Sequence, residues 1–410
     1  MSSEVVIVGG GMVGSALACA LGQSSLFNSI KLIDTMKPPP MPDSSTPDPR
    51  VVTVSPQSHR FLESINAWGF IPESRKVDFS GMNVWDYYGT GELLFPESHG
   101  WVVENIAIQS ANMQRVQELD CVEVIAPTKV EEVRRKEEQV EVLLEGGKVL
   151  SSSLVIGSDG RESKTRKDLG IKAWRKSYPH MGLVCNVKVH GGITEAYQRF
   201  LSTGPIALLP LWDDFVSVVW SLPPLEAERV KNLPTNDFLS EINSAISNQA
   251  ETQFPSSQSI HAPFISELGS DRFTFPYMLQ QAESYVDPRV ALIGDAAHTI
   301  HPMAGQGFNL GVYDAMNLAK VLCEGARVGK DPGDISTLLE YSNKAKAYNL
   351  AIAGFEQGML YAYTDFKPLH YARNLHYSLI SYLSPVRKLF VGVASGDYFA
   401  PEDLPWEKNY

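Results

Sequence analysis

The stretch EVVIVGGGMVGSALACALG, residues 4–22, joins a short apolar strand, a glycine turn and a run of small and apolar residues at helical spacing. Within it, Gly9 to Gly14 form a G-x-G-x-x-G in the strand-to-helix context that a dinucleotide-binding turn requires. Gly9 permits the tight turn, Gly11 lets the backbone approach a pyrophosphate, and Gly14 lets the helix pack closely on the strand. Asp34 ends a second strand-like segment 20 residues past Gly14, where its carboxylate can accept hydrogen bonds from a ribose. The stretch therefore predicts a bound dinucleotide.

A second motif, VIGSDGRESKTRKDLGI at residues 155–171, has a buried strand that delivers Asp159 to a glycine turn. Ser163 and Arg166 follow on that turn. Two interpretations remain open at this point. The turn either contributes to a cofactor site or is the N-capped start of a helix with surface charge.

The third motif, ALIGDAAHTIHPMAGQGFNLG at residues 291–311, again begins as a buried strand and ends in a helix. Asp295 can accept hydrogen bonds from a sugar alcohol, and glycines at a helix start can present backbone N–H groups to an anionic ring edge. We expect His298 and His301 to be structural hydrogen-bonding residues rather than groups with a direct chemical role.

Composition excludes several classes of function. The chain has 410 residues, 44% of them hydrophobic and 20% charged, with a net charge of −12 that argues against a nucleic-acid binder. Its four cysteines are scattered without a metal-ligand spacing, which predicts reduced thiols and no metal site. No signal or transit sequence is visible, although a presequence could precede this chain, and no run reaches the roughly 18 apolar residues of a membrane span.

The order of strand-like and helical segments predicts an α/β protein with a discontinuous Rossmann-like domain, a β-rich insert and C-terminal helices. We expect the nucleotide-binding domain at 1–80, 100–178 and 270–330, the β-rich substrate domain at 81–99 and 179–269, and a helical region at 331–410. Residues 37–49, KPPPMPDSSTPDP, predict a mobile surface loop. Residues 82–96 predict a hairpin, and 122–157 an antiparallel meander that ends in a buried strand.

The three motifs, in this order and at these distances, resemble the p-hydroxybenzoate hydroxylase-like FAD-dependent monooxygenases. Segments such as GWVVENIAIQ (100–109), HPMAGQGFNLG (301–311) and YLSPVRKLFVGVASG (382–396) narrow the resemblance to ubiquinone-biosynthesis monooxygenases, the mitochondrial type most closely. The resemblance covers nearly the whole chain. Two departures are Ile106, where many members of the superfamily carry a basic residue, and the proline-rich loop before Arg50, which aligns with nothing in the family.

The resemblance implies FAD as the cofactor and assigns the residues that hold it. Gly9, Gly11, Gly14 and Asp34 would bind the ADP half. Arg50 would reach the FAD phosphates, and the turn with Asp159 would approach the pyrophosphate and a nicotinamide-facing surface. Asp295 would bind the ribityl chain. The flavin ring would face a loop and helix start made of Pro302, Gly305, Gln306, Gly307 and Asn309. No side chain is expected to act as the catalyst, because the flavin carries the chemistry.

The implied reaction is hydroxylation of a polyprenylated 4-hydroxybenzoate at C5 with O2, through a flavin C4a-hydroperoxide, in ubiquinone biosynthesis. Electrons would come from a ferredoxin and its reductase or from NAD(P)H, and other ubiquinone-biosynthesis proteins would be partners. Two alternatives stay open: a hydroxylase of another phenol, and an FAD-bound scaffold of a quinone-biosynthetic complex with low turnover. The segment patterns of flavin halogenases and isoprenoid reductases are absent from the sequence.

The implied location is the matrix face of the mitochondrial inner membrane. Residues 366–396 contain no Asp or Glu and carry Lys367, Arg373, Arg387 and Lys388 among apolar residues. This pattern is typical of a helix on an anionic membrane surface. A C-terminal helix that packs on the body of the protein with basic ends has the same pattern, so both interpretations stand.

Overall fold

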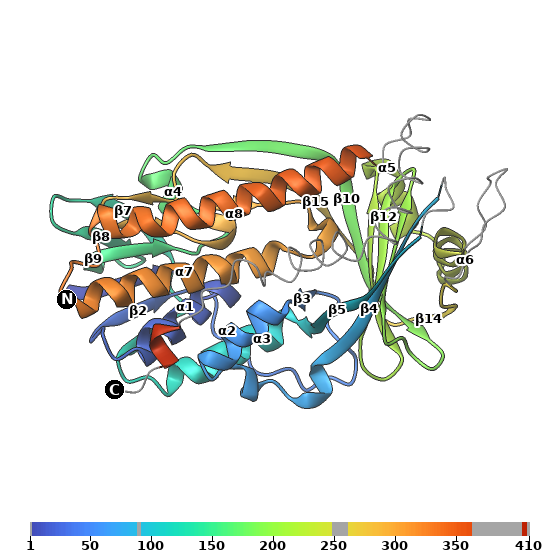
Figure 1. Ribbon diagram of the computed structural model, residues 1–410, viewed down its shortest axis with the longest axis horizontal. Coiled ribbons are helices and arrows are strands. Elements are labelled where there is room, and N and C mark those ends of the chain that lie inside the picture. Colours follow the sequence, from blue (N-terminus) through green and yellow to red (C-terminus); the bar gives the residue numbers. More distant parts are fainter. Residues whose placement is uncertain (1, 88–91, 248–260, 363–403, 408–410) are drawn as a thin grey trace.

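The computed structural model describes residues 2–87, 92–247, 261–362 and 404–407. It has two sheets, with the first at one end of the long axis and the second towards the other (Figure 1). Helices α7 (Gly307–Arg327) and α8 (Ile335–Ala362) lie side by side and run along this axis (Figure 1). The predicted α/β class is confirmed.

The first sheet is a mainly parallel sheet built around the N-terminal strand. Its order is β16-β17-β9-β1-β2-β6, and the hairpin of β7 and β8 continues from β9. The strands are β1 (Ser2–Val8), β2 (Ile30–Ile33), β6 (Val122–Ile125), β7 (Val130–Arg135), β8 (Val140–Leu144), β9 (Val149–Gly157), β16 (Val286–Asp287) and β17 (Val290–Leu292). β1 is buried on both faces, as its unbroken Val-Val-Ile-Val run predicts for a central parallel strand.

Helices α1 (Met12–Gln23), α3 (Asn105–Gln117) and α7 pack on one face of this sheet and share its main hydrophobic core (Figure 1). Small side chains let α1 and α7 approach closely. A Cβ at Gly311 would lie only 2.6 Å from a methyl carbon of Val13. Segments that are nearly three hundred residues apart in the sequence therefore meet where both helices begin.

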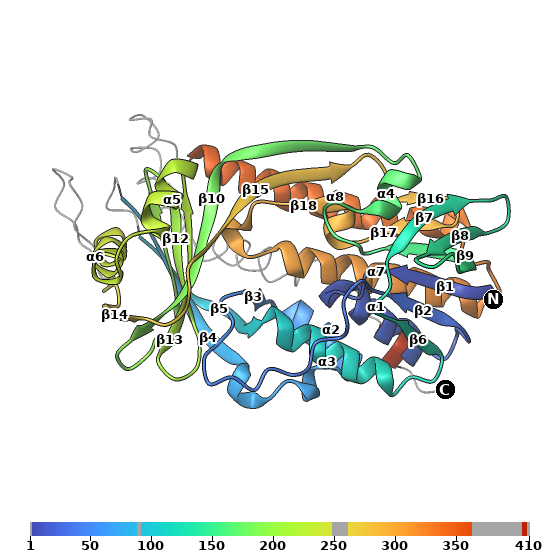
Figure 2. The same cartoon turned by 180° about the vertical axis from the view of Figure 1, so that it is seen from behind.

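The second sheet is longer and mostly antiparallel, in the order β18-β15-β10-β13-β12-β11-β4-β5-β3, with β14 beside β10. Its strands are β3 (Val51–Val54), β4 (Val77–Asp86), β5 (Glu92–Glu104), β10 (Ala173–Val189), β11 (Ala196–Leu201), β12 (Gly204–Pro210), β13 (Phe215–Leu222), β14 (Ile265–Leu268), β15 (Phe273–Ala282) and β18 (His298–Thr299). Helices α5 (Pro224–Lys231) and α6 (Thr235–Ile246) cover its outer face (Figure 2). Two shorter helices, α2 (Pro56–Ser64) and α4 (Lys164–Asp168), follow β3 and β9.

One expectation needs correction and one stays a prediction. The loop at 37–49 has no helix or strand, as predicted, and its mobility stays a prediction, although two of its carbonyls accept hydrogen bonds from other parts of the chain. The buried side chain of Asn186 donates to the carbonyl of Pro47 at 2.7 Å, and Arg75, which pairs with the buried Glu104, donates to the carbonyl of Ser44. The predicted meander is formed by β7, β8 and β9, whereas β6 pairs in parallel with β2. Isolated strand patterns do not reveal such partners.

The hairpin expected around residues 82–96 is formed by β4 and β5. Cys19, Cys121, Cys185 and Cys323 are all free thiols. Among the described residues, no helix is long and apolar enough to cross a membrane. Residues 366–396 lie entirely within 363–403, outside the described residues, so the two interpretations of this stretch stay predictions.

Candidate functional site

The first glycine turn has the geometry that its sequence predicts. Gly9 has a φ of +107°, and a Cβ there would lie 2.3 Å from the carbonyl oxygen of Ser158. A Cβ at Gly14 would lie 2.0 Å from the carbonyl oxygen of Gly9. Gly11 differs, because nothing lies within 4 Å of its Cβ position. Gly9 and Gly14 are thus required by the fold, whereas Gly11 faces open space.

Helix α1 begins at this turn without a side-chain cap among the described residues and without an acidic residue in its first turn. Its first backbone N–H groups and the positive end of its dipole are therefore available to an anion. The open space at Gly11 lies directly in front of them. This combination can bind a phosphate or pyrophosphate.

Asp34 follows β2 and lies beside the glycine turn. Its carboxylate accepts hydrogen bonds from the backbone N–H of Gly10 and of Met36, both at 2.7 Å. A small hollow beside it is lined by Gly10, Leu32, Asp34, Met36, Pro38, Gln109, Met113, Val124 and Ala126. The mixture of one carboxylate and apolar walls is suited to a ribose and a flat base. Gln109, which the sequence analysis did not single out, donates to the carbonyl of Gly10 at 2.9 Å.

Arg50 lies at the start of β3, where Asp48 binds both its backbone and its guanidinium. Its side chain is 70% exposed. The guanidinium is thus held at the surface by a carboxylate, so contact with a cofactor phosphate would compete with Asp48. Its predicted role stays a prediction.

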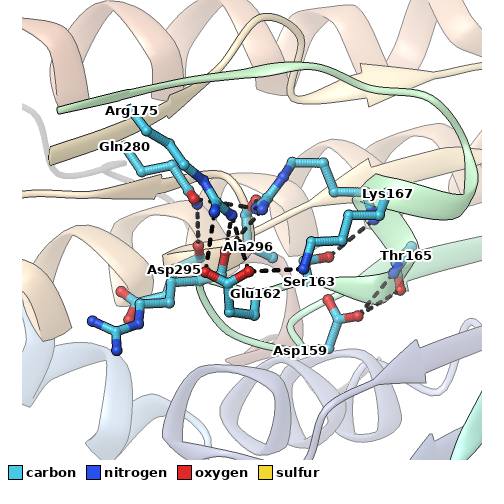
Figure 3. Close-up of polar contacts among 11 residues, drawn as sticks. Asp159, Glu162, Ser163, Thr165, Lys167, Arg175, Gln280, Asp295 and Ala296 are labelled. Carbon is cyan, nitrogen blue, oxygen red and sulfur yellow. Dashed lines mark hydrogen bonds and ion pairs between the residues drawn. The ribbon is translucent and has the colours of Figure 1, made fainter. Parts of the chain in front are cut away.

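The second motif forms the capped helix start that we considered as one interpretation. Ser163 accepts from the backbone N–H of Arg166 at 3.0 Å, and one oxygen of Asp159 accepts from Thr165 (Figure 3). The other oxygen of Asp159 is buried and has no partner within the described part of the chain. Capping therefore uses half of this carboxylate, and the other oxygen can still accept a hydrogen bond.

Arg166 links the second motif to the third. Its guanidinium is buried and donates to the carbonyl of Ala296 at 2.6 Å and to that of Arg161 at 2.8 Å. Gln280 on β15 donates to the carbonyl of Asp295 at 3.2 Å, so the loop is held from two sides (Figure 3). The exposed side chain of Asp295 extends from this fixed backbone.

A buried ion pair fixes the loop from behind. His298 and Asp314 of α7 lie 2.5 Å apart, and Asp314 also accepts from the backbone N–H of Gly294 at 2.8 Å and from Asn349 at 2.9 Å. Burial opposes a charge on His298, but the attraction of Asp314 and their hydrogen bond outweigh it and raise the pKa of His298. His298 is thus the structural hydrogen-bonding residue that we expected.

The segment from Pro302 to Asn309 ends in the start of α7. Gly305 has a φ of +62° and contacts Thr53, while nothing lies within 4 Å of the Cβ position of Gly307. No described side chain caps α7, whose first turn also lacks an acidic residue. The amide of Asn309 binds the backbone of Ser55 and Thr53, which ties β3 to α7. Like α1, α7 therefore presents an uncapped N-terminus, and the two helices touch at Val13.

Comparisons with known proteins identify the family and the fold. A family model described as an FAD binding domain matches residues 108–355. The chain is 35% identical to "Ubiquinone biosynthesis monooxygenase COQ6, mitochondrial" of Caenorhabditis elegans, over 96% of this chain and 95% of that one. It is 32% identical to the human protein of the same name, over 96% and 92% of the two chains.

Two solved structures share the fold. p-Nitrophenol 4-monooxygenase PnpA from Pseudomonas putida gives a TM-score of 0.72 at 19% identity, over 98% of this chain and 99% of that one. A probable FAD-dependent monooxygenase, pqsL from Pseudomonas aeruginosa, gives 0.74 at 21% identity, over 92% and 99%. At these identities the two structures show the fold alone.

Proposed function

The chain belongs to the family of ubiquinone-biosynthesis FAD-dependent monooxygenases, and from this premise we propose that it hydroxylates a polyprenylated 4-hydroxybenzoate at C5 of the ring. It is an oxidoreductase whose cofactor is FAD and whose pathway is ubiquinone biosynthesis. The observation that supports an FAD site in this chain is the meeting of two uncapped helix N-termini, those of α1 and α7, at Val13. One can receive the diphosphate of the cofactor and the other its redox-active ring.

The residues fit the ADP half of FAD. The open space at Gly11 in front of α1 would take the pyrophosphate, and the hollow beside Asp34 would take ribose and adenine. Asp34 already accepts two backbone hydrogen bonds, but a carboxylate has room for about four. We assign Gly9, Gly11, Gly14 and Asp34 to this half and Arg50 to its outer edge.

The flavin half would lie along the third motif. Asp295 would accept hydrogen bonds from the ribityl chain, and the start of α7 after Gly305 would donate backbone N–H groups to the ring. When bound and reduced by the electron donor, FAD would activate O2, one atom of which enters the substrate ring while the other leaves as water. The helix dipole of α7 would stabilise negative charge on the reduced ring, and Pro302, Gln306 and Gly307 would line its face.

For the electron source we propose a ferredoxin supplied by its reductase. Residues 161–176 carry seven Lys or Arg against two Asp or Glu, in a chain whose net charge is −12. Arg161, Lys167, Lys172, Arg175 and Lys176 of this segment are exposed, beside the loop that holds Asp295. Such a basic surface is suited to a small acidic electron carrier. We refer to residues 161–176 as the basic segment.

We also place the protein in the mitochondrion, peripherally on the matrix face of the inner membrane. The similar proteins of C. elegans and human are both named mitochondrial. A polyprenylated substrate resides in a bilayer, so the enzyme must reach a membrane surface. Other ubiquinone-biosynthesis proteins are expected neighbours there.

Mass spectrometry of the product tests the proposal. Purified enzyme is given a short-chain 3-prenyl-4-hydroxybenzoate and O2, with either ferredoxin and its reductase or NADPH as the donor. A product with a single added oxygen at C5, formed with ferredoxin as the donor, supports the proposal. Product formed with NADPH alone would show that NADPH, and not ferredoxin, can be the electron donor.

Rapid mixing of the reduced protein with O2 separates the two remaining alternatives. A transient C4a-hydroperoxide absorbance without hydroxylation of this substrate indicates a hydroxylase of another phenol. Absence of both the transient and the product identifies a scaffold.

A further inference from the structure

His301 is a buried side chain whose hydrogen bonds are missing. It is completely inaccessible to solvent, and neither ring nitrogen has a partner among the residues that the structure describes. Leaving a buried polar group unpaired is costly, and nearly all buried groups avoid it. The position directly before Pro302 places this imidazole at the edge of the flavin-facing loop.

Two tyrosines enclose the imidazole without bonding to it. The rings of Tyr178 on β10 and Tyr277 on β15 meet His301 edge-on, with centroids 4.8 and 4.6 Å away. The Tyr178 hydroxyl is engaged with Gln357 at 3.3 Å and the Tyr277 hydroxyl with Ser221 at 3.3 Å. The Tyr178 hydroxyl donates to Gln357, whereas the Tyr277 hydroxyl accepts from Ser221, and neither hydroxyl bonds to a nitrogen of His301.

The sheet beneath this group is built from small residues. Gly182 pairs with Ser221 across β10 and β13, and a Cβ at Gly182 would lie 2.5 Å from the Tyr277 hydroxyl. On the other side of Pro302, Met303 packs against Val84 and Phe200 of the same sheet. The loop thus lies on the inner face of the sheet, and the flexible side chain of Met303 can move to admit a ring.

Burial and, after it, the neighbouring His180 lower the pKa of His301 to about 3. The imidazole is therefore neutral at physiological pH. A neutral imidazole has one nitrogen that donates and one that accepts a hydrogen bond.

We propose that the accepting nitrogen of His301 receives a hydrogen bond from the phenolic hydroxyl of the substrate and thereby orients the ring against the flavin. This assignment rests on the proposed function, because it needs a phenol as the ligand. It explains why an unpaired polar group is kept in an aromatic enclosure, where a leucine would pack without loss.

The test compares two probes that differ only in the hydroxyl. 3-Prenyl-4-hydroxybenzoate and 3-prenylbenzoate are titrated into the FAD-loaded protein, and binding is followed by the change in flavin absorbance. We expect the hydroxylated probe to bind roughly ten- to a hundred-fold more tightly, as for one buried polar group that is paired rather than unpaired.

In His301→Leu or His301→Met this preference disappears, because no acceptor remains. His301→Gln should keep part of the preference for the hydroxylated probe, since its amide oxygen can accept a hydrogen bond. His180→Leu is the matched control and should keep the full preference. If His301 has a purely structural role, its replacement would weaken the binding of both probes by the same factor. If either the Leu or the Met variant does not load with FAD, the other gives the comparison.

The outcomes separate this inference from the proposed function. If the original protein prefers the hydroxylated probe and the Leu or Met variant does too, the assignment of His301 is wrong and the proposed function stands. If neither probe binds the original protein, the proposed substrate class fails and this assignment fails with it. A variant with lower FAD occupancy and an unchanged preference would place His301 against the flavin, which also overturns the assignment.

Discussion

The buried contact between His298 and Asp314 makes the stability of the loop that follows β17 depend on pH. The pKa of His298 is raised above its ordinary 6.5, so the folded protein keeps this proton to a higher pH than the unfolded chain. The stabilisation is complete below pH 6.5 and is lost as pH rises through the folded-state pKa. The loop should therefore become less stable at alkaline pH.

Asp314→Asn should lower the free energy of unfolding by about 3–5 kcal/mol at pH 6, because it leaves His298 buried without its counter-charge. This loss should shrink as the pH rises through the raised pKa of His298, because the imidazole then gives up its charge. Urea denaturation at several pH values measures this. Glu63→Gln, which removes the more exposed partner of His59, is the control and should cost under about 1 kcal/mol. A loss that does not vary with pH would contradict the assigned charge.

The glycines of the first turn should separate folding from cofactor binding. Gly11→Ala adds a methyl group to open space, so the stability of the FAD-free protein should change by less than about 0.5 kcal/mol, while FAD binding weakens at least about tenfold. Gly14→Ala presses a Cβ against the Gly9 carbonyl and should destabilise the FAD-free protein itself by about 1–3 kcal/mol. Thermal melting without FAD and titration with FAD distinguish the two. Equal losses in both variants would show that Gly11 also serves the fold.

At the scale of elements, Arg166 joins two loops that come from strands β9 and β17. Arg166→Lys cannot span the carbonyls of Ala296 and Arg161, so we expect the loop with Asp295 to shift and FAD occupancy to fall about tenfold. Arg175→Lys is the control at an exposed neighbour and should leave occupancy unchanged. Occupancy is read from the flavin absorbance of the purified proteins. Full occupancy in Arg166→Lys would show that Gln280 and Asp314 hold the loop without Arg166.

Elements with a local signal could be predicted, and those defined by a distant partner could not. The strand, turn and helix around Gly9 follow from adjacent residues, as does the β4–β5 hairpin. The composition of the loop at 37–49 predicts a mobile segment. It does not show that Asn186, far along the chain, donates a hydrogen bond to the backbone of this loop. The parallel partner of β6 was hidden for the same reason.

The candidate site shows the same division. The sequence places Asp34 and Asp295 after their strands, because Asp34 follows an apolar run directly and Asp295 follows one after a single glycine. It does not reveal that Asp314 pairs with His298, or that Tyr178 and Tyr277 enclose His301. Those neighbours come from other elements, and only the packed fold distinguishes a paired histidine from an unpaired one.

At the scale of the whole molecule, the basic segment is a local positive stretch in an acidic protein. Lys172→Glu should lower the ferredoxin-supported rate about tenfold at low salt, with the difference shrinking as salt screens the charges. Lys231→Glu on α5, at the opposite end of the molecule from α4 (Figure 1), makes the same charge change and should have little effect. Turnover across a salt series measures both. Equal losses at the two sites would point to net charge rather than a docking surface.

The order of the first sheet has a consequence for biogenesis. β1 pairs with β9, and β9 pairs with β17, whose residues 290–292 emerge long after the glycine turn. At ordinary rates of synthesis the interval is roughly 15–60 s, during which the turn exists without the strand that completes its sheet. Contacts this distant in sequence form slowly and leave apolar strands uncovered meanwhile. FAD that contacts both the first and the third motif, as we propose, would bind only after the third motif has folded and would then draw chains into the native state, so the supply of riboflavin should influence how much enzyme accumulates.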